Sequence, residues 1–233
     1  MDFACFFERL RTDYDLLRVL SQKTETASFL LLHKTQKKKL VVRRFSEEKP
    51  VYRFLLTVSH QNMPPVYDTL TLSDAFVMLE GYVEGVTVAE VLETGPYTVR
   101  GVKRVLAGVC EALAFLHRNG WVHRDVKPEN VVVETNGAVK LIDFDITRAV
   151  SPAAQDTRVL GTLGYAPPEQ QGLARSDPRS DIYALGVMLN VMLTLEHPSA
   201  RLAPGRMGKI VLKCTAVSPE KRFQTVEALI KKL

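Results

Sequence analysis

The sequence contains little cysteine. Its three cysteines, Cys5, Cys110 and Cys214, lie far apart in a chain of 233 residues. Disulfide scaffolds and zinc sites need more cysteines, or close pairs with partner histidines. The cysteine content therefore excludes both kinds of site and indicates a reducing compartment, so we expect a cytoplasmic location.

Long apolar runs are also absent. No stretch approaches the ~20 consecutive apolar residues that span a bilayer, and Met1–Ala4 does not begin a secretory signal. The apolar fraction of 46% and the charged fraction of 24% are typical of a globular protein rather than a disordered one. We expect no membrane partner, and a core in one large domain or two smaller lobes.

The charge balance is nearly even, with 31 basic and 26 acidic residues giving a net charge of +5. One local run is basic with no acid among its members: Lys34, Lys37, Lys38, Lys39, Arg43 and Arg44. Such a run can contact phosphates, but no aromatic side chains interleave it as stacking platforms for bases. We interpret it as a solvated hairpin turn and expect no nucleic-acid partner.

The first third of the chain has the pattern of a β-sheet. Short runs rich in β-branched and aromatic residues alternate with polar turns, which predicts strands at Tyr14–Leu20, Phe29–His33, Leu40–Phe45, Val66–Thr71 and Phe76–Glu80. Apolar residues at helical spacing within Glu47–Ser59 predict one short helix, because Pro50 suits only a first turn.

The remainder is mostly helical. Helices are predicted at Gly101–Asn119, at Asp181–Leu195 and after a cap at Ser218-Pro219-Glu220, and a hairpin is predicted from Val131–Glu134 and Val139–Ile142 around a two-residue Asn136-Gly137 turn. The predicted fold class is α+β, with a small β-rich lobe at about 13–81, a joint near 81–85 and a larger helical lobe at about 86–233.

Chemistry-bearing residues concentrate in His123–Asn130. This segment carries a carboxylate at Asp125, an ammonium at Lys127 and an amide at Asn130, and the predicted hairpin returns Asp143 to the side of Asn130. Phosphoryl transfer needs a carboxylate that orients the attacking hydroxyl, a cation on the moving phosphate and oxygen ligands for a metal ion. Oxygen ligands without thiolates suit Mg²⁺ or Mn²⁺.

These residues resemble the catalytic loop of the protein kinase superfamily, which reads His-Arg-Asp-x-Lys-Pro-x-Asn. Three later segments are similar to the end of a kinase activation segment, the start of the central helix of the larger lobe, and an arginine that pairs with Glu169: Gly161–Glu169, Asp181–Gly186 and Arg222. The resemblance runs from about Asp13 to the end and implies one two-lobed, divergent bacterial-type protein kinase domain over 1–233.

The resemblance implies roles for individual residues. Asp125 is the catalytic base, Lys127 contacts the γ-phosphate of ATP, and Asn130 and Asp143 hold Mg²⁺. Lys127, two positions after Asp125, is typical of serine/threonine kinases. The positions expected to contact the nucleotide are Arg43, Val41, Glu80, Tyr82 and Val132.

Two further roles concern regulation and structure. Arg124 is implied to bind a phosphate in the activation segment, and the available acceptors are Thr147, Ser151, Thr157 and Thr162. His123 is expected to be structural rather than a metal ligand, because the five histidines do not cluster.

The sequence departs from the kinase pattern at the expected nucleotide site. The loop between the first two strands, Ser21–Ser28, contains no glycine, although glycines there let backbone N–H groups approach phosphates. Arg43 stands in the place of the ATP-binding lysine, and Val41 replaces a small alanine. Asp145 stands where the Asp-Phe-Gly glycine is expected.

The glutamate that should pair with this lysine is also displaced. The alignment puts Val51 in its place, with Glu47 and Glu48 one turn early. Three hypotheses follow. The first is an ATP- and Mg²⁺-dependent serine/threonine kinase that acts on, and can autophosphorylate, protein hydroxyl groups. The second is a pseudokinase that binds partners without turnover. The third is a small-molecule kinase, which the Gly-Thr-x-Gly-Tyr and Pro-Pro-Glu segments disfavour.

Overall fold

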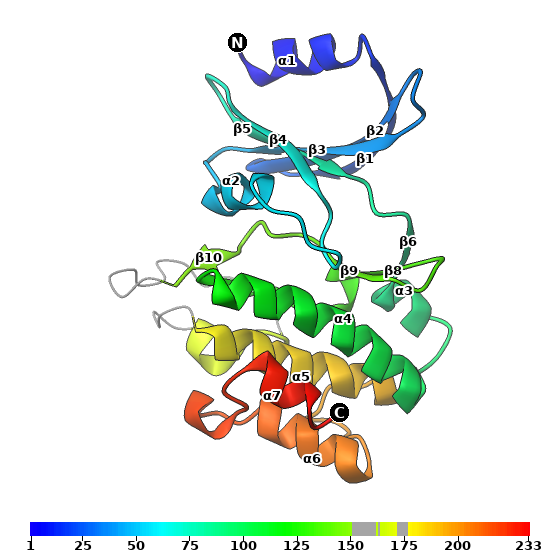
Figure 1. The fold of residues 1–233 in the computed structure, drawn as a ribbon, viewed down its shortest axis with the longest axis vertical. Helices are drawn as coiled ribbons and strands as arrows, with labels where there is room; N and C mark the ends of the chain where they lie inside the picture. The colour runs from blue at the N-terminus through cyan, green and yellow to red at the C-terminus, as the bar shows by residue number, and fades with distance from the viewer. Residues whose placement is uncertain (151–161, 163, 172–176) are drawn as a thin grey trace. The chain divides into compact units, whose positions relative to one another are not determined.

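A computed structural model describes residues 1–150, 162, 164–171 and 177–233. The chain forms two compact units, Met1–Val83 and Glu84–Leu233. The first unit is mainly β-sheet and the second mainly helical (Figure 1). The predicted α+β class is confirmed.

The first unit is built on an antiparallel sheet of five strands in the order β1-β2-β3-β5-β4. The strands are β1 (Tyr14–Gln22), β2 (Thr26–His33), β3 (Lys39–Phe45), β4 (Val66–Thr71) and β5 (Phe76–Gly81). All five were predicted, and β4 has the predicted bounds, because alternating apolar residues mark strands with two distinct faces.

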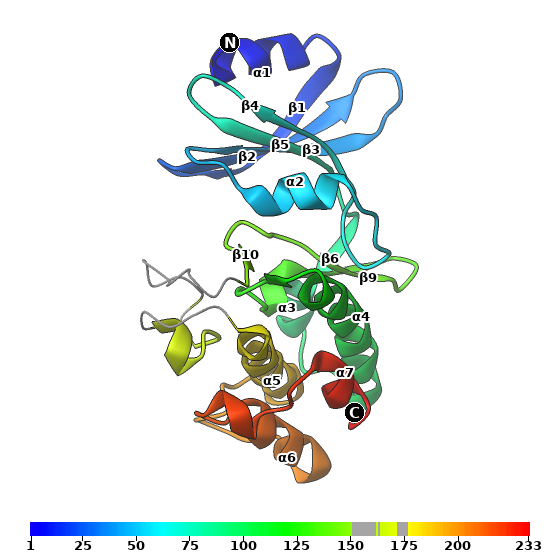
Figure 2. The ribbon, with the colours of Figure 1, turned by 60° about the vertical axis from the view of Figure 1, so that its left-hand side comes forward.

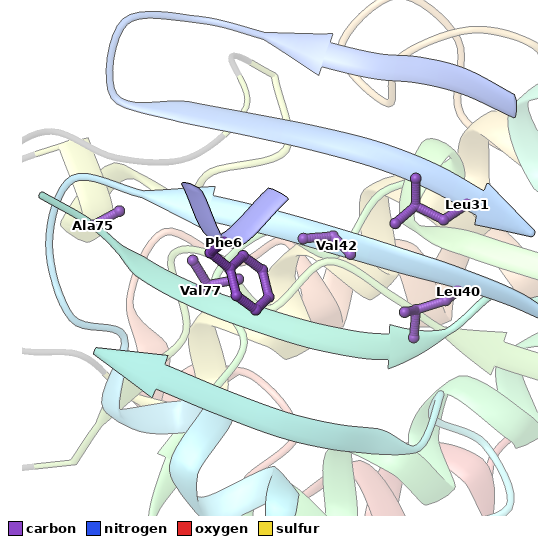
Figure 3. Packing of buried hydrophobic residues seen from close by; sticks show 6 residues of the cluster. All are labelled: Phe6, Leu31, Leu40, Val42, Ala75 and Val77. Atoms are coloured by element: carbon purple, nitrogen blue, oxygen red, sulfur yellow. The ribbon is translucent and has the colours of Figure 1, made fainter. Parts of the chain in front are cut away.

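Helices cover both faces of this sheet: α1 (Phe3–Leu10) lies on one side and α2 (Pro50–Leu56) on the other (Figure 2). Leu40 and Val42 of β3 pack with Phe6 of α1 (Figure 3). Phe45 points the other way and stacks on Tyr52 of α2, with ring centroids 5.6 Å apart. The period of two along β3 thus divides its side chains between two apolar layers.

Helix α1 was not predicted. Asp2 caps it by accepting a hydrogen bond from the backbone N–H of Cys5 at 2.8 Å. Phe3 stacks on Phe29 of β2 with ring centroids 5.9 Å apart, and Phe7 packs on Phe29 at a tilt with centroids 4.7 Å apart. The sequence signal was present as apolar residues at helical spacing after a capping aspartate, but an eight-residue helix is stable only when packed on the sheet.

The loop that replaces the glycine-rich loop is shorter than predicted. Strand β1 extends to Gln22 and β2 begins at Thr26, so the segment outside the strands is 23–25 rather than 21–28. The N–H of Lys23 donates to the carbonyl of Thr26 at 2.8 Å, which closes a tight turn. This geometry needs no glycine, because no residue in the turn has a positive φ.

The second unit is organised around two long helices, α4 (Val99–Arg118) and α5 (Pro178–Thr194). Its other helices are α3 (Val88–Leu92), α6 (Gly205–Cys214), α7 (Val226–Ile230) and the 3₁₀ turns η1 (Pro128–Asn130), η2 (Pro168–Gln171) and η3 (Pro219–Lys221). Its strands are β6 (Gly85–Thr87), β7 (Trp121–Val122), β8 (Val131–Glu134), β9 (Val139–Leu141) and β10 (Arg148–Ala149). Among the residues covered, no helix is long and apolar enough to cross a bilayer.

A glycine allows helices α5 and α6 of this unit to approach closely. A Cβ atom at Gly186 of α5 would clash with the Cβ of Cys214 on α6. Both Cys110 and Cys214 are free and buried, and burial raises the pKa of the Cys214 thiol to about 12. These cysteines are therefore packing residues, since a protonated buried thiol is unreactive.

Several predicted details of the second unit were wrong. The connection between β8 and β9 is 135–138, four residues rather than two, with Gly137 at φ 85° and its N–H bonded to the carbonyl of Glu134 at 2.8 Å. The last helix, α7, is capped by Thr225 and not by Ser218, which instead begins η3. Helices α3 and α6 were not predicted.

Candidate active site

The centre of the candidate site is a hydrogen-bonded triangle. Lys127 Nζ lies 2.8 Å from Asp125 Oδ2 and donates to Thr162 Oγ1 at 2.7 Å. Thr162 Oγ1 in turn donates to Asp125 Oδ1 at 2.7 Å. The Asp125 carboxylate therefore has both oxygens engaged, and its orientation is fixed from two directions.

Asn130 fixes the same carboxylate from within the loop. Its Nδ2 atom donates to the backbone carbonyl of Asp125 at 2.8 Å and to Asp125 Oδ2 at 2.9 Å. Because the amide nitrogen is committed to Asp125, the amide oxygen is the atom of Asn130 that is suited to bind a cation. The 3₁₀ turn η1 places Asn130 immediately before β8 and buries the side chain.

A buried carboxylate beneath the loop holds its backbone. Asp181, near the start of α5, accepts hydrogen bonds from the N–H groups of His123 at 3.0 Å and Arg124 at 2.7 Å. His117 Nε2 lies 2.8 Å from the same carboxylate. Burial alone would raise the pKa of the Asp181 carboxyl. The hydrogen bond and charge of His117, the charge of His123 and the N–H of Arg124 together outweigh burial, so the pKa of Asp181 lies below its usual range.

The loop backbone is strained at Arg124, where φ is 72° without a glycine. This left-handed conformation costs about 1–2 kcal/mol in an L-residue. Gln170 Nε2 donates to the carbonyl of Arg124 at 2.8 Å, and Asp181 holds its N–H, so contacts on both sides of the residue maintain it. Arg124 itself is buried.

Asp143 follows β9, and the residue before it is hydrogen-bonded through its backbone to Asn130. The N–H of Ile142 donates to the carbonyl of Asn130 at 2.9 Å, as the predicted hairpin requires. Asp143 has φ 66°, and the next residue, Phe144, packs edge-on against His123 with centroids 5.2 Å apart. Burial lowers the pKa of His123, against the opposing effect of nearby carboxylates, so a neutral, structural His123 fits the prediction.

The residues fit a cation held by two oxygen ligands. Asn130 and Asp143 offer an amide oxygen and a carboxylate, which suit Mg²⁺. Within the described ranges, no group of three or more His, Cys, Asp and Glu side chains gathers as a dedicated metal cage. A magnesium ion bound by one or two protein ligands together with substrate phosphates needs no such cage.

The predicted pair of Glu169 and Arg222 is present as a two-pronged contact. Arg222 Nη1 and Nη2 donate to the two carboxylate oxygens of Glu169 at 2.6 and 2.8 Å. The Arg222 side chain is fully buried and also donates to the carbonyl of Arg179 at 3.0 Å. The pair fastens η2 to the segment after α6, so the prediction is confirmed.

The predicted nucleotide residues of the first unit lie on β3 and β5 and just beyond β5. Val41 and Arg43 share one face of β3, and Glu80 of β5 pairs with Val41 in the sheet register. Arg43 Nε lies 3.2 Å from Glu80 Oε1. Tyr82 follows β5 and receives the Lys39 ammonium over its ring at 5.5 Å. In the second unit, Val132 is buried in β8.

Sequence reasoning missed the contacts made by Thr162, His117 and Gln170. Thr162 was considered only as a phosphate acceptor, whereas its hydroxyl bridges Asp125 and Lys127. Of the other acceptors, Ser151 and Thr157 lie outside the described residues, and the hydroxyl of Thr147 donates to the carbonyl of His123 at 3.4 Å. No local pattern indicated these contacts, because each joins segments 35 or more residues apart.

Comparison with known proteins gives the family. The protein kinase domain family matches residues 22–231, so the chain belongs to the protein kinase family. It is 34% identical over 201 residues to the serine/threonine-protein kinase PknB of Mycobacterium tuberculosis, covering 72% of this chain. It is 32% identical over 212 residues to the serine/threonine-protein kinase PrkC of Bacillus subtilis, covering 80% of this chain.

A third relative is more similar over a shorter stretch. The serine/threonine-protein kinase PknL of Mycobacterium tuberculosis is 44% identical over 126 residues, covering 53% of this chain. The chain spans about a third of the length of each of these relatives, 32% for PknB and PrkC and 31% for PknL. The resemblance to bacterial-type protein kinases is confirmed.

Proposed function

We propose that the protein is an ATP- and Mg²⁺-dependent serine/threonine protein kinase. The observation that supports this most strongly is the closed network of Asp125, Lys127 and Thr162, joined by contacts of 2.7–2.8 Å. Phosphoryl transfer depends mainly on positioning and charge, and this network positions a carboxylate and an ammonium together.

Asp125 acts on the acceptor hydroxyl. A carboxylate oxygen of Asp125 accepts a hydrogen bond from the Ser or Thr hydroxyl of a protein substrate and takes its proton as the oxygen attacks the γ-phosphorus of ATP. A new O–P bond forms, the bond from phosphorus to the bridging oxygen breaks, and ADP leaves with the electron pair. Lys127 stabilises the negative charge on the transferring group.

Asn130 and Asp143 would hold Mg²⁺. When bound, the ion neutralises charge on the phosphate oxygens. The chain's contribution is to orient two oxygen ligands: Asn130 through its bonds to Asp125, and Asp143 through the backbone bond between Ile142 and Asn130. These bonds fix the side chain of Asn130 and the backbone position of the residue before Asp143.

Thr162 supports a serine/threonine rather than a tyrosine acceptor. Its hydroxyl bridges the base and the lysine, so a segment of chain lies directly against Asp125. Lys127, two positions after Asp125 and in contact with the Thr162 hydroxyl, is the residue typical of serine/threonine kinases at this place. The names of the relatives agree with this assignment. The three free cysteines suit action in a reducing cytoplasm.

The test is transfer of radiolabelled phosphate from ATP, in the presence of Mg²⁺, to the protein itself and to a generic protein acceptor. Asp125→Asn should lower the rate by at least ~10²-fold, because it removes the proton acceptor. The matched control is Glu129→Gln, which removes an exposed carboxylate from the same loop and should leave the rate within about two-fold.

Two results would count against the proposal. If neither the wild-type protein nor the control transfers label, the pseudokinase alternative is favoured. If Asp125→Asn and Glu129→Gln lower the rate equally, Asp125 is not the base. Phosphoamino-acid analysis of labelled acceptor separates Ser and Thr from Tyr.

A further inference from the structure

The arginine in the lysine position forms an ion pair within the sheet. Arg43 Nε lies 3.2 Å from Glu80 Oε1, and their side chains are only 13% and 5% exposed. The pair crosses from β3 to the neighbouring strand β5, because Glu80 is opposite Val41 and Val41 shares a face with Arg43. This face is opposite the one that packs on α1, where Leu40 and Val42 lie.

Helix α2 contains no acidic side chain that could pair with Arg43. The sequence of α2, Pro50–Leu56, contains no Asp or Glu. Val51, which stands where the family's pairing glutamate is expected, is 1% exposed and belongs to the apolar core. Of the two acids one turn earlier, Glu48 forms an ion pair with Arg53 of α2 itself.

We propose that Glu80 is the positioning residue for Arg43 and that it replaces the helix glutamate of the family in orienting the cation that binds ATP. This inference rests on the proposed function, since it assigns Arg43 to the nucleotide. A nearly buried carboxylate beside a guanidinium favours one orientation of that group, because an unpaired buried charge is costly. Glu80 is therefore proposed to act on the nucleotide through Arg43.

The same geometry explains why arginine suits this position. A guanidinium has five N–H donors in a rigid fork, whereas the ammonium of lysine is a single point charge. The Glu80 carboxylate lies beside the Nε atom as an ion pair, in a geometry that is not a hydrogen bond. The attraction of the two buried charges therefore orients the guanidinium as a whole. An arginine side chain carries donors enough for both a carboxylate and a phosphate, whereas a lysine carries one charged nitrogen.

This arrangement changes what controls the site. Backbone hydrogen bonds between β3 and β5 set the spacing of Arg43 and Glu80. A cation held by a helix glutamate is released when that helix moves, but one held across two paired strands is not. Movement of α2 should therefore leave the orientation of Arg43 unchanged.

The test measures binding of Mg-ATP without turnover, by calorimetry on the full chain, together with KM for ATP and kcat. Glu80→Gln keeps the shape and removes the charge, and it should weaken ATP binding about ten-fold, with a matching rise in KM and a smaller change in kcat. The matched control is Asp74→Asn, which removes the acid paired with the adjacent Arg44 at 4.0 Å. It should leave ATP binding within about two-fold.

A double variant separates positioning from a general structural role. If Glu80 acts through Arg43, then Arg43→Ala combined with Glu80→Gln binds ATP no more weakly than Arg43→Ala alone. Additive losses would overturn the inference, as would unchanged ATP binding by Glu80→Gln or undetectable ATP binding by the wild-type protein. If ATP binding depends on Glu80 but no phosphate is transferred, the proposed function fails and the positioning role stands.

Discussion

The two units differ in how they treat their charged side chains. In the second unit, Asp125 and Lys127 contact each other, and a side chain from a distant segment, Thr162, bonds to both. In the first unit, Arg43 is paired with Glu80 on the neighbouring strand. Asp125 and Lys127 thus stand in the family's sequence pattern, whereas Arg43 departs from that pattern and has a carboxylate on the neighbouring strand as its ion-pair partner.

This difference shows which constraints can be replaced. A cation that binds phosphate needs a counter-charge to orient it, and any nearby carboxylate on a rigid element can supply that. A catalytic carboxylate needs several simultaneous contacts at fixed angles, so fewer substitutions preserve it. The β1–β2 turn is a second replacement in the first unit, because a tight backbone turn forms there without glycine.

The largest effect is expected from breaking the support beneath the catalytic loop. Asp181→Ala would leave the buried N–H groups of His123 and Arg124 without their acceptor, which should lower the free energy of unfolding by about 3–5 kcal/mol. Asp181→Asn keeps one acceptor oxygen and should cost about half as much. Urea unfolding followed by circular dichroism measures both values. A loss below about 1 kcal/mol for the alanine variant would contradict this account.

A smaller effect should be confined to the first unit. Phe6→Ala removes the ring that packs on Leu40, Val42 and Val77, and it should cost about 2–4 kcal/mol. Hydrogen exchange should show lost protection in β2 and β3 with unchanged protection in α4 and α5. Cys5→Ser, at an exposed position of the same helix, is the control. Equal loss of protection in both units would show that their stabilities are coupled.

The smallest effect concerns pH. Burial lowers the pKa of His123 below the value of about 6.5 found in unfolded chains. The unfolded state therefore binds more protons below pH 6.5, so the free energy of unfolding should fall as the pH drops from 7 toward 5. The contribution is at most about 1.4 kcal/mol per pH unit for one histidine.

The variant His123→Asn should make this pH dependence less steep, whereas His33→Asn in the first unit serves as the control. Unfolding titrations at a series of pH values measure both slopes. An unchanged slope in His123→Asn would mean that other groups account for the loss of stability in acid.

The five strands and the catalytic loop were predictable, and the reasons differ. The strands follow from alternation of apolar residues, which is a local pattern. The grouping of Asp125, Lys127 and Asn130 follows from residue types at fixed spacing within one loop, and the structure shows the three side chains in mutual contact. The pairing of Glu169 with Arg222 came from resemblance to a family.

What escaped prediction depends on tertiary structure. Helix α1 is short, and its packing against Phe29 and the sheet stabilises it more than its own sequence does. The partner of Arg43 follows from the register of β3 against β5, which sets Glu80 opposite Val41. A shift of one residue would turn Glu80 to the other face, and the sequence does not record that choice.

The left-handed backbone at Arg124 and Asp143 has a consequence for engineering and for evolution under heat. Their φ values of 72° and 66° are ones that glycine adopts freely. Replacing Asp143 by glycine would relieve the backbone while removing the carboxylate that we propose holds the cation, so on that proposal thermal tolerance and turnover select for different residues at this position. A library of variants selected only for thermal stability would therefore accumulate proteins with a higher melting temperature and a lower turnover.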